Sequence, residues 1–265
     1  MVIGIDMGAS SVKLCGLQGE HIVFTHYENG GETNVPALAD RLGIRFEKAE
    51  TVALTGLSAR KSGLEGRGIP LKYIPEPDAI GAGAVWLSGR DNAIISSIGT
   101  GTAFVLARNG VYKHLCGTGV GGGTLRGLAQ RMFGISDMTE FGNLAASGNA
   151  DAVDLLIGDF IKGDYGILDP ELTASNLARL NDAATDADWA AGITNMVLQT
   201  IGTMSMLACH GHGASCILIT GAVAGTPLSQ VNFEKFTSIY GTEFIIPAHS
   251  ECATVIGAAR LALWN

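Results

Sequence analysis

GIDMGASSVK, residues Gly4–Lys13, ends one apolar run with an aspartate, turns through a glycine and begins a second apolar run. ISSIGTGTAF, Ile95–Phe104, repeats this plan with two glycines in the turn. Such a turn places several backbone N–H groups around one small volume, which suits phosphate oxygens, and Asp6 can hold a hydrated Mg²⁺ beside them. A hairpin whose aspartate only bonds its own turn is the alternative for the first stretch alone. Two such turns facing one cleft favour the phosphate interpretation.

The segments around each turn follow a similar order, which predicts an α/β chain whose two halves open in the same way. In the first half we expect strands at 1–6, 11–16, 21–27 and 51–56, a helix at 34–43, a short strand at 71–74 and a helix at 77–87. In the second half we expect strands at 92–99, 103–108 and 111–116, helices at 124–134, 151–161 and 189–209, a strand at 216–221, a helix at 228–240, a strand at 243–247 and a last helix at 253–263.

Composition excludes several classes of protein. The 265 residues carry 17 Lys and Arg against 25 Asp and Glu, a net charge of −8, so no basic surface for nucleic acid or an anionic membrane is indicated. A hydrophobic share of 47% predicts a folded chain, and no apolar run is long enough for a membrane span. The five cysteines are scattered, which argues against a disulfide framework or a zinc site. Without an export signal, we expect a cytoplasmic protein.

Three further motifs carry candidate chemistry. Glu76 and Asp78 lie at a strand-to-helix junction between prolines, where an acid can act as a base toward a hydroxyl. The alternative is that Asp78 only interacts with the helix dipole and that Glu76 is a surface residue. GTGVGGGT, Gly117–Thr124, precedes a helix and can bind an anion or let a substrate approach the backbone; a dinucleotide fold is disfavoured because helices follow. ILITGAVAG, Ile217–Gly225, ends in small residues that a flat nucleobase can meet, or is a plain strand-to-helix connection.

In this order, GIDMGASSVK, IGTGT, TGAVAG and ECATVIGAARLAL resemble the phosphate 1, phosphate 2, adenosine and hinge motifs of the acetate-and-sugar-kinase, heat-shock chaperone and actin superfamily. Within it, EPDA at 76–79, CGTGVGGGTLRGL at 116–128 and VDLLIGDFIKGDYG at 153–166 resemble the type II pantothenate kinases. The resemblance spans nearly the whole chain. It implies two ribonuclease-H-like domains, the actin-like ATPase fold, around a nucleotide cleft.

The same resemblance implies a homodimer that transfers the γ-phosphoryl of ATP, with Mg²⁺, to the primary hydroxyl of pantothenate, the first step of coenzyme A synthesis. By position, Glu76 matches the catalytic base. Nucleotide binding falls to the three glycine turns and the adenosine loop: Asp6, Gly8, Ala9, Ser10, Ser11, Lys13, Gly99, Thr100, Gly101, Thr102, Gly121, Gly122, Gly123 and Gly221. Asp6 would hold Mg²⁺ through water. Substrate binding falls to Glu76, Thr100, Thr102 and His114.

Two departures from the family pattern concern the ligands. His114 stands where the family usually has an arginine that contacts substrate or feedback ligand, so recognition of a carboxylate or an acyl-CoA is affected. The first turn reads MGAS where a double glycine and threonine are usual; Ala9 can restrict the turn, whereas Ser10 keeps a hydroxyl.

We expect an N-terminal domain at 1–88, with the C-terminal helix 253–265 packing back on it, and a second domain with a helical insertion at 89–252. A sugar or amino-sugar kinase of the same superfamily is the alternative enzyme. An energy-coupling ATPase, such as the iron–sulfur dehydratase activators, is the alternative class, although it needs clustered cysteines.

Overall fold

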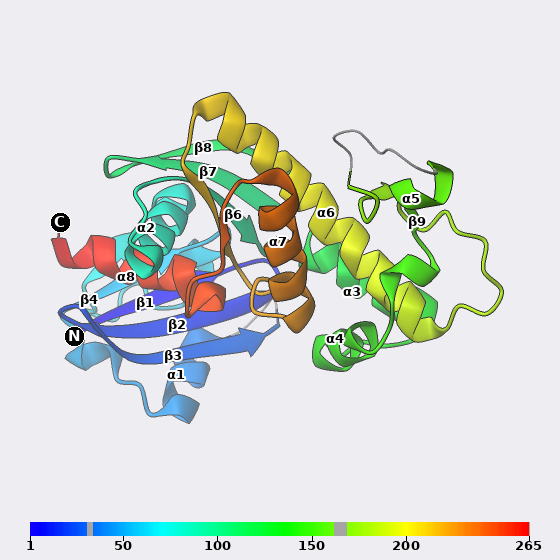
Figure 1. Cartoon of the computed structure of the whole chain (residues 1–265). Coiled ribbons are helices and arrows are strands. Elements are labelled where there is room, and N and C mark those ends of the chain that lie inside the picture. Colours follow the sequence, from blue (N-terminus) through cyan, green and yellow to red (C-terminus); the bar gives the residue numbers. More distant parts are fainter. Residues whose placement is uncertain (31–33, 162–168, 265) are drawn as a thin grey trace.

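The computed structural model describes residues 1–30, 34–161 and 169–264, which form a mixed α/β structure with two five-stranded sheets (Figure 1). The first sheet has the order β3-β2-β1-β4-β5. Its strands are β1 (Val2–Met7), β2 (Ser11–Gln18), β3 (His21–Asn29), β4 (Thr51–Thr55) and β5 (Leu71–Tyr73). β1, β2 and β3 pair antiparallel, whereas β1, β4 and β5 pair parallel.

The second sheet repeats this topology, in the order β12-β11-β6-β7-β8. Its strands are β6 (Asn92–Ile98), β7 (Thr102–Arg108), β8 (Val111–Thr118), β11 (Cys216–Thr220) and β12 (Phe244–Ile245). Here too the first three strands pair antiparallel and the last two join β6 in parallel. The expectation that the two halves open in the same way is therefore confirmed.

Two helices, α2 (Glu76–Ser88) and α8 (Ala253–Trp264), lie side by side between the sheets (Figure 1). α2 follows the first sheet in the chain but packs on the second through Ile80 and Ala84, whereas the C-terminal α8 packs on the first through Val255 and Ile256. Each sheet is thus covered on its inner face by a helix from the other half. The domain boundaries at 88/89 and 252/253 stay a prediction.

The outer face of the first sheet is covered by α1 (Val35–Leu42) and two short 3₁₀ helices, η1 (Phe46–Lys48) and η2 (Ala59–Lys61). α1 begins where Asn34 Oδ1 accepts a hydrogen bond from the Ala37 N–H at 3.0 Å, and Pro36 occupies the first turn. Val35 and Leu38 are the buried positions that face the strands.

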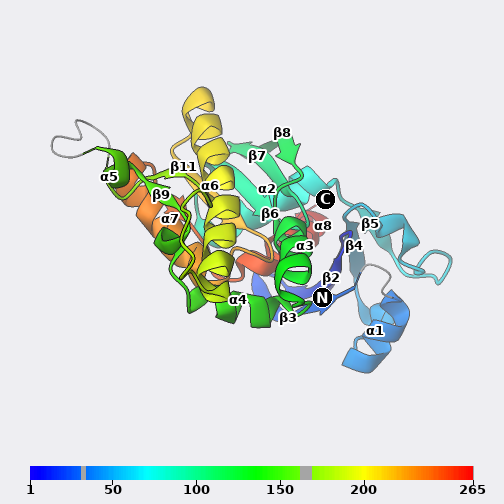
Figure 2. The ribbon, with the colours of Figure 1, turned by 90° about the vertical axis from the view of Figure 1, so that its right-hand side faces the viewer.

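The outer face of the second sheet is covered by a helical layer (Figure 2). Its helices are α3 (Gly122–Phe133), α4 (Met138–Ala146), α6 (Asp186–His212) and α7 (Pro227–Tyr240). The long α6 contacts the other three and the sheet, with Ile193, Val197 and Ile201 in the core. These residues form a core face of the helix.

The helix predicted at 151–161 is wrong. This segment holds a 3₁₀ turn, η3 (Ala150–Ala152), a two-residue strand, β9 (Leu155–Leu156), and one helical turn, α5 (Ile157–Phe160). β9 pairs with β10 (Thr173–Ser175), and Asp154 is fully buried and accepts a hydrogen bond from Leu177 N–H at 2.7 Å. These long-range contacts replace the local helical ones. The GDYG part of the family motif, 163–166, lies outside the described residues.

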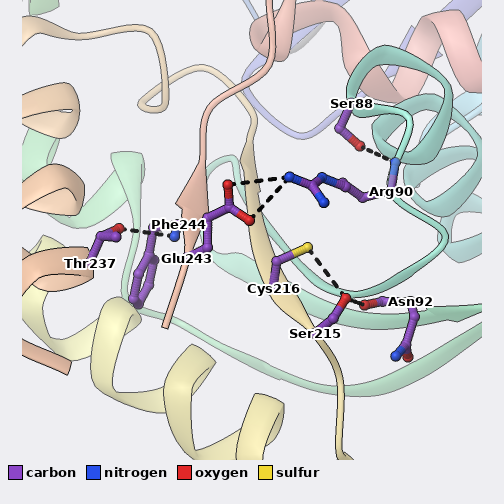
Figure 3. Close-up of polar contacts among 8 residues, drawn as sticks. All are labelled: Ser88, Arg90, Asn92, Ser215, Cys216, Thr237, Glu243 and Phe244. Carbon is purple, nitrogen blue, oxygen red and sulfur yellow. Dashed lines mark hydrogen bonds and ion pairs between the residues drawn. The ribbon is translucent and has the colours of Figure 1, made fainter. Parts of the chain in front are cut away.

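The connection between α2 and β6 is tied to the far edge of the second sheet (Figure 3). Arg90 Nη2 lies 3.3 Å from both carboxylate oxygens of Glu243, and Ser215 Oγ donates to the Asn92 carbonyl at 2.6 Å. The end of α2 is thereby fixed relative to β11 and β12.

After β12, the chain reaches α8 through the 3₁₀ turn η4 (Ser250–Cys252). Among the described residues, no helix is long and apolar enough to cross a membrane.

Candidate active site

The two glycine turns that the sequence singled out meet each other in space. The turn between β1 and β2 carries Ser10, and the turn between β6 and β7 carries Thr100. Ser10 Oγ and Thr100 Oγ1 lie 2.8 Å apart, although the residues are 90 positions apart in the chain. The equivalent hairpins of the two halves therefore face one another across a single cleft.

A cavity of about 480 Å³ opens beside this contact. Ser10, Ser11 and Lys13 line it from the first turn, and Gly99 and Thr100 line it from the second. Its volume falls in the range of small-molecule and cofactor sites. The remaining wall comes from β3, the beginning of α3, α4, α6, the loop before α7 and Glu251. The cavity is thus built by both halves of the chain.

The third glycine cluster holds α3 against the second turn. Gly122 N–H donates to the Gly99 carbonyl and Gly123 N–H to the Thr100 carbonyl, both at 2.8 Å. A Cβ at Gly123 would lie 2.8 Å from the Thr100 carbonyl oxygen, and one at Gly122 would lie 2.9 Å from that of Gly99. These two N–H groups are therefore engaged with the turn, and the missing side chains permit the close approach. Both glycines also line the cavity.

Asp6 and Lys13 form a buried ion pair at the base of the first turn. Lys13 Nζ lies 3.2 Å from Asp6 Oδ2, and the two side chains are 11% and 7% exposed. Lys13 Nζ also lies 5.5 Å from the centre of the Tyr27 ring. Asp6 itself does not line the cavity, but Lys13 does, so the lysine connects the carboxylate with the cavity.

Glu76 is the first residue of α2, and Asp6, Lys13 and His114 act on its charge. Burial raises the pKa of its carboxyl, and the charge of Asp6 raises it further, whereas Lys13 and His114 lower it. These three residues come from β1, β2 and β8. Glu76 does not itself line the cavity, whereas Lys13, one of the residues that act on its charge, does. A carboxyl with a raised pKa beside a cleft is a candidate base.

The other predicted residues fall into two groups. Gly8 and Ala9, in the first turn, and His114, within β8, do not line the cavity. Ala9 is exposed and is not among the non-glycine residues with positive φ, so the MGAS turn accommodates it without left-handed backbone.

The second group serves the structure of the turns. Thr102 Oγ1 donates to the Val120 carbonyl at 2.8 Å, which ties β7 to the segment before α3. A Cβ at Gly101 would lie 2.6 Å from the Thr118 carbonyl oxygen, and one at Gly121 would lie 2.8 Å from the Gly101 carbonyl carbon. Gly221 has φ +95° and donates its N–H to the Ser250 carbonyl at 2.9 Å. The cavity wall begins one residue later, at Ala222.

Sequence reasoning missed the wall that α4 supplies. Met138, Thr139, Phe141, Gly142, Asn143 and Ala145 line the cavity, together with Tyr27, Asn29, Arg126, Thr194 and the run Gly225–Leu228. The only sequence signal for α4 is Asp137, whose Oδ1 accepts from Thr139 N–H at 2.7 Å as a helix cap. Nothing in the apolar face of α4 distinguishes a cavity wall from a core.

The donor set suits a hydrated cation held by one carboxylate. Among the described residues, no three His, Cys, Asp or Glu side chains gather into a metal site. Mg²⁺ commonly keeps several waters and takes one or two carboxylates plus phosphate oxygens, so Asp6 alone is compatible with it. All five cysteines are free, and only Cys116 is exposed.

The fold is that of the actin-like ATPases. A solved structure of the activator of the 2-hydroxyisocaproyl-CoA dehydratase from Clostridium difficile, with bound ADPNP, has a TM-score of 0.65 at 19% identity and covers 98% of this chain and 93% of its own. A ROK family glucokinase from Streptomyces griseus, in complex with glucose and AMPPNP, has a TM-score of 0.62 at 14% identity and covers 100% and 99%. The predicted actin-like ATPase fold is confirmed.

Within this class, the chain belongs to the Fumble family, whose model matches residues 93–235, more than half of the chain. A type II pantothenate kinase of Staphylococcus epidermidis is 29% identical over 231 residues, which cover 84% of this chain and 85% of that protein. The resemblance to type II pantothenate kinases is thereby confirmed at the level of the family.

Proposed function

We propose that this protein phosphorylates pantothenate on its primary hydroxyl with ATP. The contact between Ser10 and Thr100 carries the proposal, because it brings two glycine turns to one cavity that both halves of the chain build. The family supports a kinase, and a relative named type II pantothenate kinase supports this acceptor.

The phosphates of ATP would lie across the two turns. The hydroxyls of Ser10 and Thr100 can donate to phosphate oxygens, and Lys13, which lines the cavity, supplies a positive charge for them. The nucleoside would extend toward the wall formed by α4 and the loop before α7. Mg²⁺, held near Asp6 through water, would neutralise charge on the phosphates when bound.

Glu76 would act as the base toward the acceptor. The proton of the acceptor hydroxyl passes to the Glu76 carboxylate as the oxygen forms a bond to the γ-phosphorus, and the bond from that phosphorus to the β-phosphate oxygen breaks to release ADP. A carboxyl whose pKa is raised by burial and by Asp6 is a stronger base than an exposed glutamate. Closure of the cleft would exclude water from this step.

The test is a coupled ADP-release assay with purified protein and an acceptor panel of pantothenate, glucose and N-acetylglucosamine. We expect turnover with pantothenate, and Glu76→Gln should lower kcat by about 10²-fold or more while leaving binding of an ATP analogue intact. The exposed Glu47→Gln is the matched control and should behave as wild type.

Two results would contradict the proposal. Preference for either sugar would make the protein a sugar or amino-sugar kinase, and ADP release that ignores every acceptor would make it an energy-coupling ATPase. A homodimer, feedback by acyl-CoA, and acceptor contacts by His114, Thr100 and Thr102 stay predictions.

A further inference from the structure

Two buried threonines occupy equivalent positions at the ends of equivalent strands. Thr55 ends β4 and precedes Gly56, and Thr220 ends β11 and precedes Gly221. The two glycines have nearly equal φ values of +91° and +95°. The internal repeat of the fold therefore extends to a Thr-Gly turn in each half.

Both threonine hydroxyls are buried without a hydrogen-bond partner among the described residues. Thr55 is 1% exposed and Thr220 is 0% exposed. A buried hydroxyl left unpaired costs free energy, because it has lost its bonds to water. The protein without ligand therefore offers no hydrogen bond that would explain a threonine at either position.

The neighbour of Thr55 differs from the neighbour of Thr220. Thr55 is paired with Asp6 in the parallel register of β1 and β4, so the two side chains project from the same face of the sheet on adjacent strands. Thr220 is paired in the same way with Ser97. Only the threonine of the first half therefore stands beside a carboxylate of the candidate active site.

The two oxygens of the Asp6 carboxylate have different neighbours. A Cβ at Gly56 would lie 2.7 Å from Asp6 Oδ1, so only a residue without a side chain leaves room for this oxygen. Asp6 Oδ2 is held by Lys13, which also lines the cavity. When phosphate oxygens compete for Lys13, the carboxylate loses part of its partner and faces like charge.

We propose that Thr55 is a positioning residue for Asp6, whose carboxylate receives a hydrogen bond from the Thr55 hydroxyl once a nucleotide engages Lys13. The bond would offset the lost contact with Lys13 and hold Asp6 in one orientation. This inference rests on the nucleotide site of the proposed function, and on the proposed acceptor only for its kinetic readout.

The experiment compares Thr55→Val, Thr55→Ser and Thr220→Val. Thr55→Val removes an unpaired buried hydroxyl, so the melting temperature of the nucleotide-free protein should be unchanged or rise by a few degrees. With pantothenate and ATP its kcat should fall about ten- to a hundredfold, as expected for one hydrogen bond to a charged group, while KM for pantothenate stays within twofold. Thr55→Ser should restore kcat. Thr220→Val should likewise keep or slightly raise the melting temperature. Its nucleotide binding should depend on Mg²⁺ as that of wild type does.

Binding of a non-hydrolysable ATP analogue, measured by calorimetry against Mg²⁺ concentration, gives a readout that needs no turnover. Thr55→Val should need several times more Mg²⁺ for the same affinity than wild type or Thr55→Ser. If wild type fails to phosphorylate pantothenate, the proposed function is lost and this arm still tests Thr55. Wild-type kcat and Mg²⁺ dependence in Thr55→Val, a fall in its melting temperature, or a rise only in KM for pantothenate would overturn the inference.

Discussion

Ser10 Oγ lies 2.8 Å from Thr100 Oγ1, and this contact joins the first β-hairpin turn of one half of the chain to the first turn of the other. Both residues line the same cavity. Because each hydroxyl can donate or accept, the pair can exchange its mutual bond for bonds to a phosphate group without leaving a polar atom unpaired. This contact between the two turns is therefore also the place where a nucleotide would separate them.

Removing either hydroxyl should weaken nucleotide binding. Each of Ser10→Ala and Thr100→Ala should raise KM for ATP about fivefold, which corresponds to about 1 kcal/mol for one hydrogen bond. Because both hydroxyls serve one ligand and touch one another, the double variant should depart from the product of the single effects. Steady-state kinetics of the four proteins measure this coupling. The exposed Ser238→Ala is the control, and strictly additive effects would mean that the two turns act on different groups.

Glu76 should set the acid limb of the pH profile. As the base it acts in the charged form, and its pKa is raised by burial and by Asp6. Activity should therefore fall with decreasing pH at a value above the ordinary glutamate pKa of about 4.3. His114 lowers the pKa of Glu76, so His114→Gln should move the limb to higher pH. A limb that stays in place in this variant would separate His114 from the acid.

The same shift should make Glu76 unfavourable for stability at neutral pH. A carboxyl whose pKa is higher in the folded state binds more protons there, so stability falls as pH rises from the ordinary pKa through the raised one. Glu76→Gln should be more stable than wild type at pH 7, and the difference should vanish below about pH 4. Urea midpoints at both pH values measure this. Equal stability at pH 7 would mean that the carboxylate is well solvated.

Local patterns were sufficient to predict most of the fold. Alternating apolar residues and glycine turns predict the hairpins in both halves, and Asn34 with Pro36 predicts the start of α1, because each signal acts within a few residues. The segment 151–161 was predicted wrongly because its apolar spacing fits a helix, whereas Asp154 is bound by groups more than twenty residues away. No local rule contains that contact.

Only part of the site could be predicted from the sequence, for a similar reason. The sequence singled out the glycine turns, and a Cβ at Gly101, Gly122 or Gly123 would lie within 3.0 Å of neighbouring backbone, so side chains are excluded there. The cavity wall from α4 and the orphan hydroxyl of Thr55 depend on which elements come to lie together. Thr102, which was predicted to bind ligand, has its hydroxyl donating to the neighbouring Val120 carbonyl.

Asp154 should be the main anchor of the segment that precedes α6. Its carboxylate is fully buried and accepts hydrogen bonds from Leu177 N–H and Asn195 Nδ2, both at 2.7 Å. Asp154→Ala would remove the charged acceptor of these half-buried donors, which should cost about 2–4 kcal/mol of unfolding free energy. Asp151→Ala, three residues earlier and exposed, should change it by less than about 0.5 kcal/mol. Denaturant unfolding compares the two, and similar small losses would show that the anchor lies elsewhere.

The crossing of α2 and α8 should tolerate no side chain at Gly83 or Gly257. A Cβ at Gly83 would lie 1.8 Å from the Ala253 carbonyl oxygen, and one at Gly257 would lie 1.9 Å from that of Ala79. These carbonyl oxygens belong to the helix backbone and cannot rotate away, so either alanine must force the two helices apart and separate both from their sheets. We expect each substitution to cost more than about 4 kcal/mol or to prevent folding.

Gly127 provides the matched control for this crossing, because it is also a helical glycine but a Cβ there would meet nothing within 4 Å. Gly127→Ala should raise the unfolding free energy by about 0.5–1 kcal/mol, since alanine restricts the unfolded chain more than glycine does. Urea unfolding of the three variants measures the contrast. If Gly257→Ala unfolded within 1 kcal/mol of wild type, the two helices would be able to separate cheaply, and the rigid contact between the halves of the molecule would have to be assigned to the turns at Ser10 and Thr100 instead.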